Sequence, residues 1–370
     1  MLKSARLSPR PIAQAVGLLA LWCVSGAAMA QSSVTLGGVM DGGLRIVKNS
    51  GLPIERTEMS GSNMTSRFYL RGTEDLGGGL SAGFHVETGL QLPTGSTASS
   101  VAGQFWDRRS TVSLASSSLG ELRLGRDYAP SYTSWSMFDP FGYVGIAGSN
   151  NLISSSPQGP IRAAFGSNPN TTVRSNSGFQ WFSPGGWGGV NANLFVTANE
   201  GGTAAAGIHK VTGLRVGWSG SGVRLSAAST RTSNDLTTLG SFTDNTVGAS
   251  YDFSGVRISA AWRRFQYANA RQTNLMLAGT IKVGQSGNVK ISLGKNSFNG
   301  NVGATNISSN SARLVGLGYV HDLSRRTALY AHVARLSNRG ALSMAIAGGY
   351  PGLAAGGSST GYEFGLRHIY

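Results

Sequence analysis

The last eleven residues of the chain, Thr360 to Tyr370, constrain its fold more than any other stretch. Four of the five positions in one alternate row are aromatic or apolar; the row is Tyr362, Phe364, Leu366, His368 and Tyr370. The other row is mostly polar or small. Alternation with period two indicates a β-strand with one apolar and one polar face. A strand that crosses a bilayer needs about 9–11 residues, with lipid on one face and water on the other, so this segment predicts a strand of a transmembrane barrel.

The rest of the chain offers partners for such a strand. From Ser33 onward, short alternating segments are broken by clusters of Gly, Ser and Asn, which is typical of strands and turns. We expect sixteen strands, an even number as in single-chain bacterial barrels, with the last strand paired to the first. The expected strands span residues 33–47, 65–75, 80–92, 105–116, 120–126, 171–183, 188–198, 209–218, 222–231, 244–253, 256–268, 272–283, 287–296, 309–322, 327–338 and 358–370.

The connections between these segments alternate in length. Tight turns such as 77–79 and 254–255 alternate with longer polar segments such as 48–64, 232–243 and 339–357. Short turns on one side of the membrane and long loops on the other are the pattern of outer-membrane barrels, whereas a soluble sandwich has no reason to alternate in this way. The predicted fold is therefore all-β, a 16-stranded antiparallel transmembrane β-barrel.

The N-terminus has the features of an export signal. A basic start precedes an apolar run at 12–24, and residues 28–30, Ala-Met-Ala, form a small-x-small cleavage site. The run is too short for a membrane anchor, which needs about 20 residues. The only cysteine, Cys23, follows Trp22 rather than the small residue that a lipoprotein signal requires. We expect residues 1–30 to be a cleaved signal peptide and residues 31–370 to form one barrel domain without a thiol.

Charge and composition exclude several classes of partner. The formal net charge is +15, and charged residues make up only 13% of the chain. The basic residues are scattered along the chain, at most two together, rather than in runs, which does not favour a nucleic-acid partner. The sequence contains no His pair at helical spacing and no acidic calcium loop, so we expect no metal and no cofactor.

Several segments, taken in order, resemble the general porins of Gram-negative bacteria, in particular the trimeric β-proteobacterial kind. The matching segments are 33–36 (SVTL), 66–77 (SRFYLRGTEDLG), 120–126 (GELRLGR), 138–142 (FDPFG), 174–177 (RSNS), 323–327 (LSRRT) and 365–368 (GLRH). The resemblance implies a homotrimer in the Gram-negative outer membrane, in contact with outer-membrane lipid and lipopolysaccharide. It also implies insertion by the outer-membrane assembly machinery, which reads a C-terminal aromatic residue. The family usually ends in Phe, and this chain ends in Tyr370.

The longest expected connection is 127–170. It is rich in Tyr, Trp, Phe and Gly, which indicates that it packs against other parts of the molecule. A barrel of about sixteen strands has a lumen wide enough for an aqueous channel. The third extracellular loop of the family folds into the lumen and constricts it, and the resemblance implies this role for 127–170.

Most basic side chains turn toward the lumen when the apolar row of each strand is assigned to lipid. Phe68 and Leu70 point outward, for example, so Arg67 and Arg71 point inward. The same rule turns inward Arg45, Tyr69, Arg109, Arg123, Arg174, Arg215, Arg224, Arg257, Arg263, Lys290 and Arg367, together with the acids Asp41, Glu87, Glu121, Asp252 and Glu363. Strict alternation points Arg126 outward, but it lies at a strand end, where the family often turns such an arginine to the pore.

We expect a basic constriction. The family sets wall bases against acids of the third loop, and the resemblance places Arg67 and Arg174 on the wall, with Arg109 as a looser match. From residue 128 to 199 the only acid is Asp139. The expected pore-lining residues are Arg45, Arg67, Arg71, Arg109, Arg126, Asp139, Arg162 and Arg174. Because basic rings and clefts favour anions, we expect passive diffusion of small polar or anionic solutes with a preference for anions.

Three other functions stay open at this point. A substrate-specific channel could line a sugar path with Tyr128, Tyr132, Trp135 and Phe138, although such residues more often pack a loop. An outer-membrane enzyme is disfavoured, because none of the five histidines stands in a motif with a nucleophile and an acid. A secreted adhesin of sandwich type would differ from a trimeric barrel by the lack of heat-resistant trimer bands in detergent.

Overall fold

The computed structural model describes residues 32–370 except 100, 102, 154–157 and 199–201. The expected signal peptide, residues 1–30, lies outside the described residues. No helix within the described part of the chain has both the length and the apolar character needed to cross a membrane.

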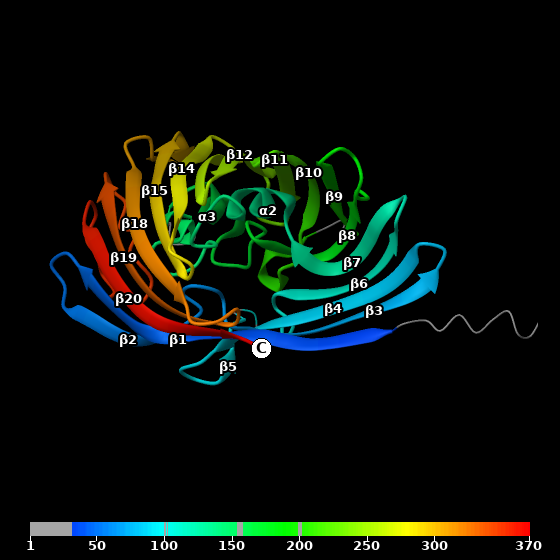
Figure 1. Cartoon of the computed structure of the whole chain (residues 1–370). Coiled ribbons are helices and arrows are strands. Elements are labelled where there is room, and N and C mark those ends of the chain that lie inside the picture. Colours follow the sequence, from blue (N-terminus) through cyan, green and yellow to red (C-terminus); the bar gives the residue numbers. More distant parts are fainter. Residues whose placement is uncertain (1–31, 100, 102, 154–157, 199–201) are drawn as a thin grey trace, which may run out of the picture.

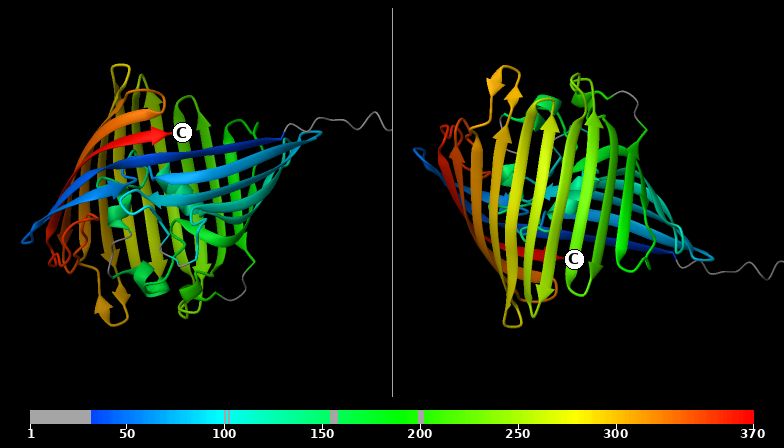
Figure 2. Two further views of the ribbon diagram at one scale, coloured as in Figure 1. Left: turned by 90° about the horizontal axis from the view of Figure 1, so that it is seen from below. Right: turned by 90° about the horizontal axis from the view of Figure 1, so that it is seen from above.

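One large antiparallel sheet contains 18 strands and closes on itself (Figure 1). Figure 2 shows these strands side by side along the wall. The strands of this large sheet are β1 (Ser33–Asn49), β2 (Ile54–Ser60), β3 (Arg67–Gly77), β4 (Leu80–Gln91), β5 (Ser96–Thr97), β6 (Arg109–Ser116), β7 (Gly120–Tyr128), β8 (Arg174–Phe182), β9 (Val190–Thr197), β10 (Lys210–Gly220), β11 (Val223–Ser233), β12 (Phe242–Phe253), β13 (Val256–Tyr267), β14 (Ala270–Val283), β15 (Gly287–Asn299), β18 (Ser311–Asp322), β19 (Thr327–Arg339) and β20 (Ser358–Ile369). A separate hairpin joins β16 (Asn301–Val302) to β17 (Thr305–Asn306). The helices are α2 (Pro130–Ser136), η1 (Ser149–Leu152), α3 (Pro160–Phe165) and η2 (Ala204–Ala206).

The predicted number of barrel strands and the predicted seam are confirmed. β2 and β3 lie end to end against β1 and count as one barrel strand. The two-residue β5 pairs only with the end of β4 and does not span the wall, so sixteen strands circle the barrel. β20 pairs with β1 in one register, from Val39 opposite Ile369 to Asn49 opposite Ser359. The last strand therefore pairs with the first and closes the barrel.

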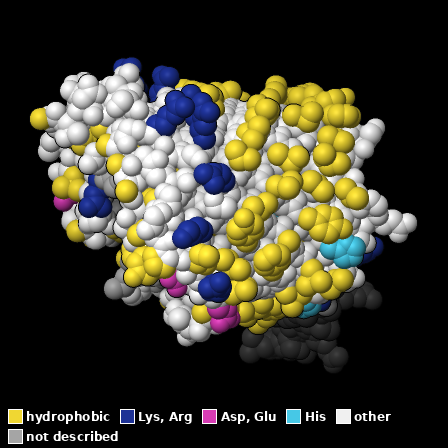
Figure 3. Space-filling view, turned by 90° about the vertical axis from the view of Figure 1, so that its left-hand side faces the viewer, with side chains coloured by type: hydrophobic (Ala, Val, Ile, Leu, Met, Phe, Trp, Pro, Cys, Tyr) yellow, Lys and Arg dark blue, Asp and Glu magenta, His cyan; other side chains and the backbone are white. Residues whose placement is uncertain are grey.

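The barrel is apolar on its outer face, as the alternation predicts for a wall with lipid outside and water inside. On β18, Val315 and Leu317 are exposed on the outer row, while Ala312 and Leu314 are buried on the inner row. Figure 3 shows the outer apolar side chains gathered into a broad band over one side of the molecule. A soluble protein would bury these residues instead.

The expected loop at 48–64 is wrong in part, because residues 54–60 form β2. This segment, Ile-Glu-Arg-Thr-Glu-Met-Ser, carries charges on both alternate rows, so it lacks the apolar row that reveals a spanning strand. It pairs with the second half of β1, from Gly42 opposite Ser60 to Lys48 opposite Ile54. Residues 61–66 then leave the wall, and β3 resumes the same line along β1.

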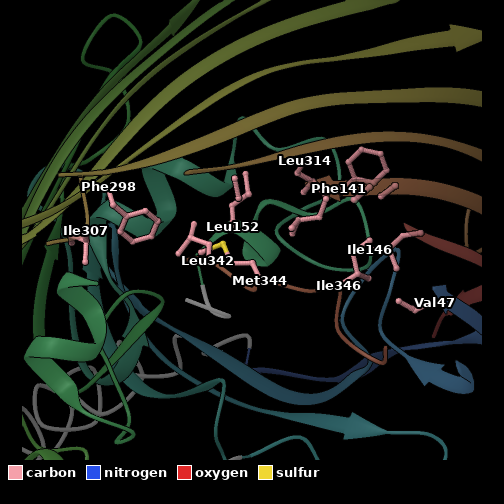
Figure 4. Close-up of a cluster of buried hydrophobic side chains, with 14 of the residues drawn as sticks. Val47, Phe141, Ile146, Leu152, Phe298, Ile307, Leu314, Leu342, Met344 and Ile346 are labelled. Carbon is pink, nitrogen blue, oxygen red and sulfur yellow. The ribbon is translucent and has the colours of Figure 1, made fainter. Parts of the chain in front are cut away.

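The long connection after β7 lies against the inner side of the wall, with α2 next to β10–β12 and α3 next to β12–β14 (Figure 1). Two inward-facing glycines make room for it. A Cβ at Gly248 would fall 2.3 Å from the Phe138 ring, and one at Gly316 would fall 2.5 Å from the Ala147 side chain. In Figure 4 the loop residues Phe141, Ile146 and Leu152 share one apolar cluster with residues of two other long connections; those residues are Ile307, Leu342, Met344 and Ile346.

Candidate pore constriction

Three arginines gather beside the start of the long connection. Arg67 begins β3, Arg108 precedes β6, and Arg174 begins β8. The guanidinium groups of Arg108 and Arg174 both donate to the Tyr128 hydroxyl, at 3.0 and 2.9 Å. Glu87 on β4 accepts from Arg108 at 2.5 Å and lies 3.8 Å from Arg67. One carboxylate therefore pairs with two of the three guanidinium groups, and the third, Arg174, is joined to them through the Tyr128 hydroxyl, so the cluster has a net positive charge.

Arg174 is the member of this cluster whose charge stays unbalanced. It forms no ion pair with any described residue. Its Cζ lies 4.4 Å from the centroid of the Tyr128 ring, and its buried Nε has no hydrogen-bond partner. Stacking on an aromatic face holds a guanidinium without neutralising it. The charge of Arg174 is therefore free to act on a passing solute.

A ladder of tyrosines joins this wall to the long connection. The Tyr128 and Tyr132 rings stack with centroids 5.2 Å apart, and Tyr132 meets the edge of Tyr143 at the same separation. Burial raises the pKa of the Tyr132 hydroxyl above its usual range, so that hydroxyl stays neutral. The ladder positions Tyr128 without adding negative charge beside the arginines.

Arg45 and Arg109 point inward, but each faces a carboxylate. Arg45 donates from Nε to Glu363 at 2.6 Å. Arg109 lies 3.4 Å from Asp127, which also pairs with Arg123 at 2.7 Å. These arginines build local ion pairs along the wall, so their charges contribute less to the lumen than that of Arg174.

Arg126 lies in a β-bulge, where β7 shifts register between Gly125 and Asp127. Its guanidinium donates to the Asp107 carbonyl at 2.6 Å and to the Asn176 side chain at 2.7 Å. These contacts place it in a polar cavity of about 450 Å³ that Arg174 also lines. A bulge can re-aim a side chain in this way, which is why strict alternation does not place Arg126. Burial lowers the pKa of His209, another lining residue, so it is neutral near pH 7 and adds no charge to this cavity.

Arg71 and Arg162 are exposed and form no ion pair within the described residues. Arg71 lies on β3 with its Cζ 5.7 Å from the centroid of the Tyr69 ring. Arg162 lies on α3, which packs against β12–β14. Both are apart from the cluster around Tyr128, and the structure brings them into no contact with it.

Asp139 turns into its own loop. Its carboxylate accepts from the backbone N–H groups of Phe141, Tyr143 and Ser149, at 2.9, 3.2 and 2.9 Å. It also accepts from the Ser149 hydroxyl at 2.6 Å, and the residue is only 6% exposed. These bonds hold the bend at 139–149, so the one acid of the long connection stabilises the shape of the loop.

Sequence reasoning missed Arg108 and singled out Arg109, its neighbour. Arg108 lies one residue before β6, where the inward and outward alternation does not yet apply. The pair Arg108-Arg109 was itself a usable signal, because two adjacent bases at a strand entrance can both reach the lumen. Lys290, which alternation does turn inward, is a further cation, and its Nζ donates to the Asn63 side chain at 3.1 Å. The described residues hold no group of three His, Cys, Asp or Glu suited to a metal ion.

Comparisons with known proteins identify the family of this chain. The family model described as Gram-negative porin matches residues 15–341. Outer membrane porin protein 32 of Delftia acidovorans is 33% identical over 367 residues, which cover 95% of this chain and 98% of that protein. An outer membrane porin of Bordetella pertussis is 28% identical, covering 94% and 96%. An anion-selective porin from Comamonas acidovorans superimposes with a TM-score of 0.77 at 29% identity, over 92% of this chain and all of that one.

Proposed function

Because this chain belongs to the Gram-negative porin family and forms an outer-membrane channel, we propose that its pore conducts small hydrophilic solutes with a preference for anions. The observation that carries the proposal is the cluster of Arg67, Arg108 and Arg174, in which Glu87 pairs with Arg67 and Arg108 while Arg174 binds the Tyr128 hydroxyl and keeps its charge unpaired. The anion-selective porin among the solved structures is similar along nearly the whole chain, which supports the same preference.

The charge pattern gives the physical basis. Charges of one sign in a narrow lumen with low-dielectric walls concentrate counter-ions, and rings of Arg or Lys favour anions. In this lumen Glu87 is shared between two arginines, and Asp139 is enclosed by its own loop. We therefore propose that Arg67, Arg108 and Arg174 line the narrowest part of the channel and attract anions there. The family and fold point to a channel rather than an enzyme.

The first test is the reversal potential of the purified channel in a planar bilayer across a KCl gradient. We expect its sign to show that chloride is more permeant than potassium, because the field of the arginine cluster favours anions over cations. A bulky organic anion in place of chloride reports the width of the same path. A reversal potential that shows potassium to be the more permeant ion would contradict the proposal.

We also propose that the chain forms a homotrimer, held in the outer membrane among lipid and lipopolysaccharide. One solved barrel that shares the fold, OmpT of Vibrio cholerae, is described in a trimer form; it has a TM-score of 0.63 at 14% identity. Electrophoresis of unheated, detergent-solubilised membranes tests the proposal, with a heat-sensitive band at three times the monomer mass as the expected result.

Deletion of Tyr370 is expected to lower the amount of inserted protein several-fold and to leave single-channel conductance unchanged. Tyr370 closes the seam, where its backbone exchanges hydrogen bonds with Gly38 at 3.2 and 3.3 Å, and it lies outside the arginine cluster. We propose that the assembly machinery reads this aromatic end. Quantitative blotting of outer-membrane fractions and single-channel recording measure the two quantities. The conservative change Tyr370→Phe is the control and should insert normally, whereas full insertion of the deletion variant would refute the role.

A further inference from the structure

The short segment 61–66, which separates β2 from β3, lies on the lumen side of the wall. The Ser62 hydroxyl donates to the Glu363 carboxylate of β20 at 2.8 Å, and the Asn63 side-chain oxygen accepts from Lys290 of β15 at 3.1 Å. Both partners belong to the inward rows of their strands, so a segment that reaches both of them is inside the barrel.

Met64 of this segment lies beside the arginine cluster. Its backbone N–H donates to the buried Asp41 carboxylate at 2.6 Å, which fixes the position of the residue. Its Sδ accepts from Arg67 Nη2 at 3.6 Å. A thioether is a weak acceptor, and the ion pair of Arg67 with Glu87 spans 3.8 Å. The guanidinium of Arg67 is therefore held by weak contacts, and a better acceptor at position 64 would draw it closer.

Met64 is also the methionine best placed to meet a solute of the lumen, because it is partly exposed on the inner side. No other methionine of the described chain accepts a hydrogen bond from a charged side chain. The others are Met40 on the outer face, Met137 against an apolar cluster of the long connection, and the buried Met59, Met276 and Met344.

We propose that Met64 is an oxidation site whose sulfoxide weakens the anion preference of the pore. Hydrogen peroxide that enters the lumen transfers one oxygen atom to Sδ. The O–O bond breaks, an S–O bond forms, the thioether loses two electrons to the peroxide, and water leaves. The shift in ion preference rests on the proposed function, whereas the oxidation itself does not.

The sulfoxide lowers the positive field of the constriction in two ways. Its oxygen carries partial negative charge and accepts from the Arg67 guanidinium, so it offsets part of that charge. It also draws Arg67 away from Glu87, whose carboxylate is then less neutralised. Both changes reduce the advantage of anions over cations in the lumen. Methionine sulfoxide can be reduced enzymatically, so the change is reversible.

The test combines site-resolved mass spectrometry with electrical recording on the full barrel. Purified protein in detergent is treated with graded hydrogen peroxide, and the oxygen gained by each methionine is measured after digestion. We expect Met64 to be oxidised at peroxide concentrations that leave Met276 and Met344 unmodified, because those two are buried. In planar bilayers, oxidised channels should have a chloride-to-potassium permeability ratio about twofold lower than untreated channels, since the sulfoxide offsets only part of one unit charge.

Two variants isolate the contribution of Met64. Met64→Leu keeps an apolar side chain without sulfur, so peroxide should leave its permeability ratio where it was before treatment. Met64→Gln places an amide oxygen beside Arg67 and should have the lowered ratio before any treatment. The matched control is Met40→Leu, which removes a sulfur from the outer face and should respond to peroxide as the wild type does.

The outcomes separate the oxidation site from the ion preference. The site is overturned if Met64 stays unmodified while the buried Met276 is oxidised. Full oxidation of Met64 with an unchanged ratio overturns its action on Arg67, and so does an equal fall of the ratio in peroxide-treated Met64→Leu. An untreated channel that prefers potassium would instead refute the proposed ion preference, and mass spectrometry would still decide whether Met64 is the oxidised residue.

Discussion

Replacing Arg174 with glutamate is expected to lower the chloride-to-potassium permeability ratio of the channel by about tenfold or more. The change shifts the charge beside Tyr128 by two units. A unit charge acts on an ion about 4 Å away with about 1 kcal/mol even in bulk water, so two units give about 2 kcal/mol. Arg174 forms no ion pair with a described carboxylate, so its positive charge is not already neutralised, whereas that of Arg108 is paired with Glu87. Reversal potentials across a KCl gradient measure the ratio directly.

Arg231→Glu is the matched control, because it makes the same charge change on the outer face of β11. We expect this variant to keep the permeability ratio of the wild type. If Arg174→Glu also keeps that ratio in a folded channel, the constriction is not formed by the cluster around Tyr128. If both variants shift the ratio equally, the preference arises from the overall surface charge of the barrel.

The wall of this barrel could be predicted from the sequence because two solvents act on every spanning strand. Lipid on one side and water on the other impose the period-two pattern that Val315, Leu317 and the closing strand display. β2 escaped prediction because charges such as Arg56 and Glu58 stand on its outer row, so it lacks the apolar row that reveals a spanning strand. The short helices inside 127–170 escaped it because their burial depends on distant strands, for example on the space above Gly248.

The candidate site was only partly predictable, for a related reason. Alternation turns Arg45, Arg67, Arg109 and Arg174 inward, and the structure places them there. It cannot say which of them meets a carboxylate, because pairs such as Arg45 with Glu363 join residues that are far apart in the sequence. Net field, and therefore selectivity, depends on these pairings. The inward set contains more bases than acids, but the unbalanced charge of Arg174 is visible only in three dimensions.

Arg263→Leu is expected to destabilise the folded barrel by about 3–5 kcal/mol, because it leaves the Asp244 carboxylate buried without its partner. Both side chains are almost fully buried, at 0% and 2% exposed, with 2.7 Å between Arg263 Nη2 and Asp244 Oδ2. The pair also forms hydrogen bonds with both ends of the long connection. Arg263 donates to the Thr172 carbonyl at 2.6 Å, and Asp244 accepts from the Ser131 hydroxyl at 2.7 Å. The variant should lose its folded electrophoretic band at a lower temperature and show larger, noisier single-channel currents.

The same two strands supply the control, since Arg257 and Asp252 form an exposed pair on β13 and β12, at 38% and 34% exposure. Removing Arg257 should cost no more than about 1 kcal/mol, because solvent already screens that pair. A second variant, Arg263→Leu with Asp244→Leu, should recover part of the thermal stability, because it also removes the unpaired buried carboxylate. It should not restore the low noise of the single-channel current, because the hydrogen bonds to Ser131 and Thr172 are still missing. If Arg263→Leu instead behaves like Arg257→Leu in both measurements, the long connection is held by its apolar cluster alone, and the buried pair contributes nothing to the width of the pore.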